Sequence, residues 1–108
     1  MVPNDIINEL YELTAMNKNG VEALYEAEVA LARAENTLDK VESQSFLGNS
    51  GSVADRQAIA KMDAADSRLE RDLAKAKVNR VKTKLRVIES AIMAQATMSK
   101  LMQAEMKL

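Results

Sequence analysis

The chain has 108 residues, of which 47% are hydrophobic and only 3% are aromatic, and it contains neither His nor Cys. It therefore lacks the commonest proton shuttle and the thiolate and imidazole ligands of metals. We expect no enzyme, no metal site and no cofactor. The net charge of −1 conceals an acidic first half and a basic second half, and the length predicts a single domain over residues 1–108.

The composition predicts an all-α protein, because three Gly and one Pro leave long stretches without helix breakers. Apolar spacing predicts helices over residues 4–17, 21–46 and 53–107. We expect the first helix to end near Asn19 and Gly20, with Asn19 capping the second. A Gly-containing connection at residues 48–51 then leads to Ser52, which is expected to cap the third helix.

The apolar residues of the second and third predicted helices form stripes suited to pairing. In the second helix the stripe has an a/d pattern: Leu24, Ala27, Leu31, Ala34, Leu38 and Val41. In the third helix, Ile59, Met62, Leu69, Leu73 and Ala76 form one stripe. Val78, Val81, Leu85, Ile88 and Ile92 form another, displaced by about one residue. These stripes predict an antiparallel, coiled-coil-like helical hairpin with a short N-terminal helix and one very long C-terminal helix. The register expected from charge sets Arg33 near Asp66 and Glu28 near Arg71.

A strongly basic stretch lies at residues 71–86, where seven Lys or Arg side chains stand against one acid. Four of them lie past the end of the acidic partner helix: Arg80, Lys82, Lys84 and Arg86. A fifth, Lys77, lies just before them. These residues are predicted to bind an anionic partner such as single-stranded nucleic acid. Because no aromatic residue lies among them, binding should be electrostatic and dependent on salt. The alternative is that these side chains pair with the chain's own acids or form a solvated face.

The last 16 residues are rich in Met, and a helical chain of this size buries little apolar surface within one copy. We therefore expect a homo-oligomer or another partner interface formed by Ile92, Met98, Leu101, Met102 and Met106. The longest uncharged runs fall short of the roughly 18 residues that span a bilayer. No basic segment precedes an apolar one at the start. We expect a cytoplasmic protein with no membrane partner.

The order of elements resembles that of UvsY-type recombination mediators, which are small phage-encoded helical proteins. The shared features are a helix rich in Glu, Lys and Ala, a Gly-containing turn, a Ser-x-x-Asp-Arg entry (Ser52, Asp55, Arg56) and a long helix with recurring Asp, Lys, Val and Leu. The last of these features comprises Asp72, Lys75, Lys77, Val78, Val81 and Leu85. The resemblance implies a ring-forming protein that binds single-stranded nucleic acid and contacts a recombinase and a single-strand-binding protein. The chain departs from the family in being shorter, poor in aromatic residues and without a separate oligomerisation element.

Two functions follow as hypotheses. The first is a phage accessory protein of DNA recombination or replication, located in the host cytoplasm, that binds single strands non-specifically and assists a recombinase. The second is a protein-binding adaptor or inhibitor that docks through the Met-rich end or the acidic helix and binds no nucleic acid. Neither hypothesis involves a small-molecule substrate.

Overall fold

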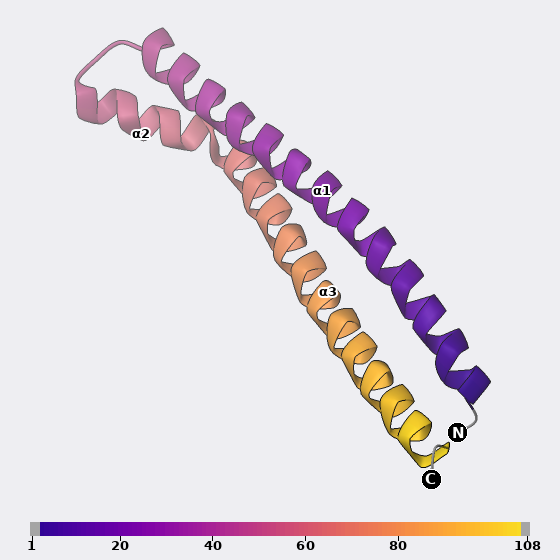
Figure 1. Ribbon diagram of the computed structural model, residues 1–108. Coiled ribbons are helices and arrows are strands. Elements are labelled where there is room, and N and C mark those ends of the chain that lie inside the picture. Colours follow the sequence, from indigo (N-terminus) through magenta and orange to yellow (C-terminus); the bar gives the residue numbers. More distant parts are fainter. Residues whose placement is uncertain (1–2, 107–108) are drawn as a thin grey trace. The chain divides into compact units, whose positions relative to one another are not determined.

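The computed structural model describes residues 3–106, and within them it contains three helices and no strand (Figure 1). The helices are α1 (Pro3–Gly48), α2 (Val53–Asp63) and α3 (Ala65–Met106). The all-α prediction and the long C-terminal helix are therefore confirmed for this part of the chain. The expected helix end at residue 107 lies outside the described residues. The chain divides into two compact units: unit 1 joins the residues up to Leu24 with those from Arg80 onward, and unit 2 comprises Tyr25–Asn79.

Helix α1 runs without a break through the point where two helices were expected to meet, so the predicted stop at Asn19 and Gly20 is wrong. The reason is that the apolar repeat continues there. Leu13, Asn17, Gly20 and Leu24 follow one another at steps of four and three residues, and all four are half-buried. Tertiary contacts on this face outweigh the weak helix preference of Asn and Gly.

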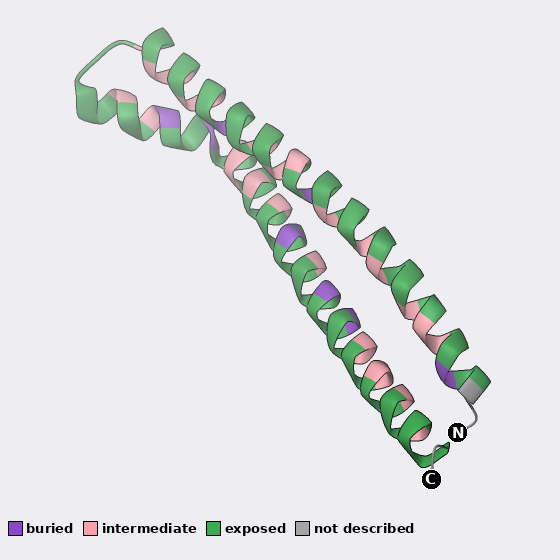
Figure 2. Cartoon of the chain, in the orientation of Figure 1, coloured by how far each residue is buried: buried purple, intermediate pink, exposed green. Residues whose placement is uncertain are grey.

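One face of α1 is covered along nearly its whole length, as the purple and pink bands of Figure 2 show. We call this face the α1 seam. It repeats at alternating steps of four and three residues, the spacing of a and d positions. Its members are buried or half-buried: Ile6, Leu10, Leu13, Asn17, Gly20, Leu24, Ala27, Leu31, Ala34, Leu38 and Val41. All six stripe positions predicted for residues 21–46 belong to this seam.

The connection from α1 to α2 satisfies helix-end groups with side chains. Ser52 accepts a hydrogen bond from the Asp55 amide at 3.1 Å, which confirms the predicted N-cap. At the end of α1, the Asn49 side-chain amide donates to the Ser45 carbonyl at 2.6 Å, and Arg56 Nε donates to the Phe46 carbonyl at 3.0 Å. The last carbonyls of a helix have no amide partner within it, so these contacts stabilise the end of α1.

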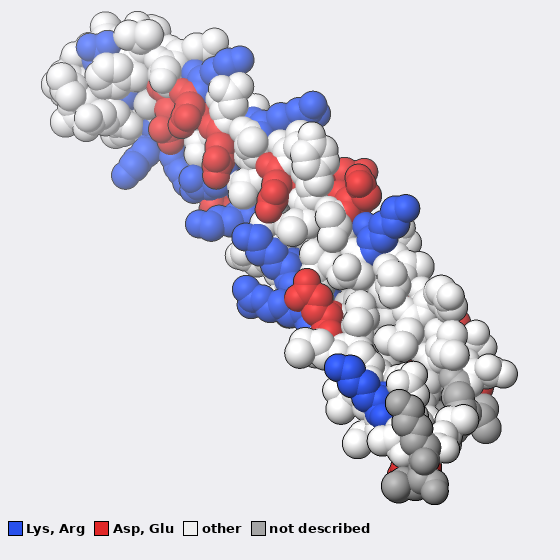
Figure 3. Space-filling model, viewed as in Figure 1, with Lys and Arg blue, Asp and Glu red and all other residues white. Residues whose placement is uncertain are grey.

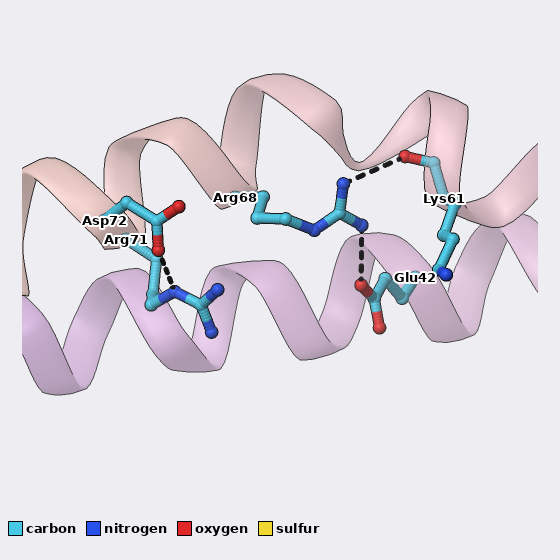
Figure 4. A network of polar contacts seen from close by, with 5 residues as sticks. All are labelled: Glu42, Lys61, Arg68, Arg71 and Asp72. Atoms are coloured by element: carbon cyan, nitrogen blue, oxygen red, sulfur yellow. Dashed lines mark hydrogen bonds and ion pairs between the residues drawn. The ribbon is translucent and has the colours of Figure 1, made fainter.

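The expected single helix over residues 53–107 is wrong, because the chain breaks helical geometry at Ala64, between α2 and α3. Ala64 is completely buried. Arg68 braces this break, as Figure 4 shows: its Nη1 lies 3.4 Å from the Lys61 carbonyl, in the last turn of α2, and its Nη2 lies 3.1 Å from Oε1 of Glu42 on α1. One guanidinium thus links a helix-end carbonyl of α2 to a carboxylate of α1.

Replacement of Arg68 with Ala is expected to lower the free energy of unfolding by about 1 kcal/mol, because both side chains of its ion pair with Glu42 are partly exposed. Urea unfolding at one protein concentration measures the change. Arg33→Ala is the control, since Arg33 is exposed and forms no ion pair among the described residues. Equal stability of the two variants would show that the contact with Arg68 does not hold the break.

The covered face of α2 and α3 differs from the prediction in its first part. The stripe through Met62, Leu69 and Leu73 faces solvent, with exposures of 78%, 57% and 56%. The covered positions keep one phase without a stutter and include several small residues in this part. The repeat comprises Ala60, Ala64, Ser67, Arg71, Ala74, Val78, Val81, Leu85, Ile88, Ile92, Gln95, Ser99 and Met102, and half-buried neighbours such as Ile59 flank it. The predicted stripe from Val78 to Ile92 is confirmed as part of this α3 seam.

The observed register also differs from the one expected from charge. In unit 2, Glu42 pairs with Arg68, and Arg71 pairs at 2.8 Å with Asp72 of its own helix rather than with Glu28. In unit 1, the Gln95 side-chain amide donates to Glu9 at 2.8 Å. Complementary side-chain volumes in the seams outweigh exposed ion pairs, which contribute only about 0–1 kcal/mol each.

Candidate nucleic-acid interface

The predicted cationic residues Arg80, Lys82, Lys84 and Arg86 lie in unit 1, on one continuous stretch of α3. Between them lie Val81 and Leu85, which face α1, and Thr83, which is exposed; Leu85 is 8% exposed. Packing of this apolar face fixes the orientation of the helix. The four basic side chains are all exposed, and they are spread around the remaining surface of α3. We call these four residues the cationic segment.

The cationic segment has no acidic partner within the part of the chain that the structure describes. The two ion pairs found there involve Arg68 and Arg71, and no hydrogen bond from Arg80, Lys82, Lys84 or Arg86 is present. Figure 3 shows Lys and Arg side chains exposed on the visible face, with Asp and Glu side chains among them. The charge of this stretch therefore stays available to an anionic ligand.

Lys77, the fifth predicted nucleic-acid-binding residue, lies three residues before the cationic segment, in unit 2. It is exposed and has no ion-pair partner among the described residues. Its charge is therefore available to an anionic ligand.

A shallow cavity of about 340 Å³ lies beside the cationic segment in unit 1. Its lining consists of apolar and small residues with Lys84 among them: Met16, Asn19, Gly20, Ala23, Val81, Lys84, Leu85 and Ile88. Leu85 packs closely against Gly20 at this cavity, because a Cβ atom on Gly20 would lie 2.5 Å from Cδ2 of Leu85. Lys84 thus lies at the edge of the contact between α1 and α3.

The five residues predicted to form an oligomer or partner interface do not share one face. Ile92 and Met102 are half-buried in the α3 seam, whereas Met98, Leu101 and Met106 are 39%, 62% and 75% exposed. The spacing of Met residues placed them on one stripe, but the contact with α1 divides them. Part of the Met-rich end is therefore intramolecular core.

Two polar side chains in the seams of unit 1 were missed by the sequence analysis. Oδ1 of Asn17 and Oε1 of Gln95 are buried and accept no hydrogen bond within the structure. Gln95 uses its amide nitrogen for the contact with Glu9. A heptad numbering carried through Gly20 would have placed Asn17 at a seam position, and continuing the stripe from Val78 to Ile92 by three residues would have placed Gln95 at one. Such polar residues lower stability and help to fix register.

A larger open groove of about 740 Å³ lies in unit 2, between the end of α1 and the start of α2. Its apolar lining consists of Phe46, Leu47, Ala54, Ala58 and Ala60. The guanidinium of Arg56 lies over the Phe46 ring, 4.2 Å from its centroid, which holds that ring in place. No group of three or more acidic side chains that could hold a metal ion occurs among residues 3–106.

No known family model matches this chain, and no curated protein and no solved structure gives a significant match to it. Within the described residues, no helix combines the length and apolar character required to cross a bilayer. The chemistry of the chain's own residues is thus the basis for a functional proposal.

Proposed function

We propose that this protein binds single-stranded nucleic acid without sequence specificity, through Arg80, Lys82, Lys84 and Arg86, with Lys77 at the margin. One observation carries the proposal: four exposed cations occur within residues 80–86 of a single helix, and none has a carboxylate partner among the described residues. A rigid helix that presents unpaired cations attracts phosphates.

The physical basis of binding is the release of counterions from the phosphate backbone. Lys and Arg contacts to phosphates position a strand without reading its bases. The cationic segment has no aromatic residue, so base stacking contributes little there. Binding through this segment should therefore be indifferent to sequence and sensitive to salt.

The biological role in this proposal is that of an accessory protein of DNA recombination or replication, which assists a recombinase on single strands. The resemblance to UvsY-type mediators in the Ser-x-x-Asp-Arg entry and the long basic helix supports it. We further propose that α1 and α3 form an antiparallel coiled-coil hairpin and that copies of the chain associate. The regular alternation of four and three residues in both seams supports the coiled coil.

Titration of a fluorescent single-stranded oligonucleotide at two salt concentrations tests the proposal. Four phosphate contacts predict a slope of about −3 in a plot of log affinity against log salt, so affinity should fall about 50-fold between roughly 50 and 200 mM salt. Oligonucleotides of different sequence should bind equally well. Absence of binding at the lower salt concentration, or a strong preference for one sequence, would contradict the proposal.

A further inference from the structure

An exposed apolar stripe of unit 2 lies on α3, outside the seam that packs against α1. Its three residues, Leu69, Leu73 and Ala76, follow one another at steps of four and three, and the two Leu side chains are 57% and 56% exposed. We call them the outer stripe. Because its spacing is that of a and d positions, the outer stripe has the geometry of a second helix-pairing surface.

Two charged residues flank the outer stripe on the same side and carry opposite signs. Glu70 and Lys77 are seven residues apart, so they lie two turns apart on one edge of the stripe. Both are exposed, and neither forms an ion pair among the described residues. When two copies of such an edge meet in antiparallel orientation, the acid of each copy lies beside the base of the other.

We propose that a second copy of this chain packs on the outer stripe, with the two α3 helices antiparallel and related by a two-fold axis. Leu73 of each copy then lies against Leu73 of the other, and Leu69 of each copy lies against Ala76 of the other. In this register, Glu70 of each copy lies beside Lys77 of the other, so the two flanking ion pairs are equivalent. The pairing of Glu42 with Arg68 at 3.1 Å beside the intramolecular seam shows the same kind of flanking contact.

A parallel arrangement of the two copies is less favourable. It would align Lys77 with Asp72 of the other copy, but Asp72 already accepts a hydrogen bond and an ion pair from Arg71 at 2.8 Å. Glu70 would then remain without a partner. The antiparallel pair uses two groups that are free within the described residues, and it leaves Arg80, Lys82, Lys84 and Arg86 outside the flanking ion pairs.

The solution mass of the full chain, measured by sedimentation equilibrium, tests the dimer. Leu69→Glu combined with Leu73→Glu should give a monomer, and circular dichroism should remain helical because both side chains are solvent-exposed. Glu70→Lys alone and Lys77→Glu alone should each weaken association about tenfold, and the double exchange should restore it. Asp39→Lys, at an exposed acid on α1, is the control and should not change association.

Cysteine cross-linking tests the direction of the helices, because the chain has no Cys of its own. A mixture of Glu70→Cys and Lys77→Cys copies should form the mixed disulfide in preference to either symmetric one. A wild-type monomer at the highest soluble concentration, or a double exchange no better than the single changes, would overturn the proposal. Oligonucleotide titration of the Leu69→Glu, Leu73→Glu variant separates the two proposals, since loss of the dimer leaves the cationic segment intact.

Discussion

Replacement of Arg80, Lys82, Lys84 and Arg86 with Glu is expected to reduce affinity for single-stranded oligonucleotide by at least about 100-fold at low salt. Four attractive contacts with phosphates become four repulsive ones. The fold should persist, because all four side chains are exposed and make no hydrogen bond or ion pair among the described residues. Fluorescence anisotropy measures the affinity, and circular dichroism checks the helix content.

The matched control changes four other exposed bases to Glu: Lys18, Arg33, Lys40 and Lys100. This variant has the same net charge as the first, so a general effect of net charge would weaken binding equally in both. We expect the control to keep most of its affinity, since its altered residues lie outside the cationic segment. Equal losses in the two variants would remove the assignment of the binding surface to residues 80–86.

Leu85→Ala is expected to lower the free energy of unfolding by about 2–4 kcal/mol. Leu85 is 8% exposed in unit 1, and its side chain fills the space left by the missing Cβ of Gly20. Truncation removes apolar contacts and leaves a cavity between the helices. Urea unfolding at one protein concentration measures the change. Val87→Ala, on the same helix but 65% exposed, should change stability by less than about 0.5 kcal/mol.

A double-mutant cycle shows whether Gly20 and Leu85 are directly coupled. In the wild-type background, Gly20→Ala gains about 1 kcal/mol of helix propensity but forces its new methyl group against Leu85, so we expect a net loss of stability. In the Leu85→Ala background the same change should stabilise the chain by about 1 kcal/mol. Equal effects of Gly20→Ala in both backgrounds would show that the close approach does not constrain residue 20.

The exposure of the four cationic side chains could be predicted from local sequence. Which apolar residues of the Met-rich end are covered could not be predicted in this way. Arg80, Lys82, Lys84 and Arg86 are exposed because intervening residues such as Leu85 occupy the face toward α1. The Met-rich end shows the limit of this reasoning, since Ile92 and Met102 are half-buried whereas Leu101 and Met106 are exposed. Which members of an apolar stripe are covered depends on where the partner helix lies, and spacing along one helix does not contain that information.

The sequence by itself determined the elements whose causes are local. The scarcity of Gly and Pro dictated long helices, and Ser52 with Asp55 marked the start of α2. The tertiary structure decided the passage of α1 through Gly20 and the break at Ala64, because both depend on contacts with a distant segment. It also placed small residues of the α3 seam, rather than Leu69 and Leu73, on the covered face. The stability of close packing between helices depends on how well side-chain volumes fit together, and not only on the hydrophobicity of single residues.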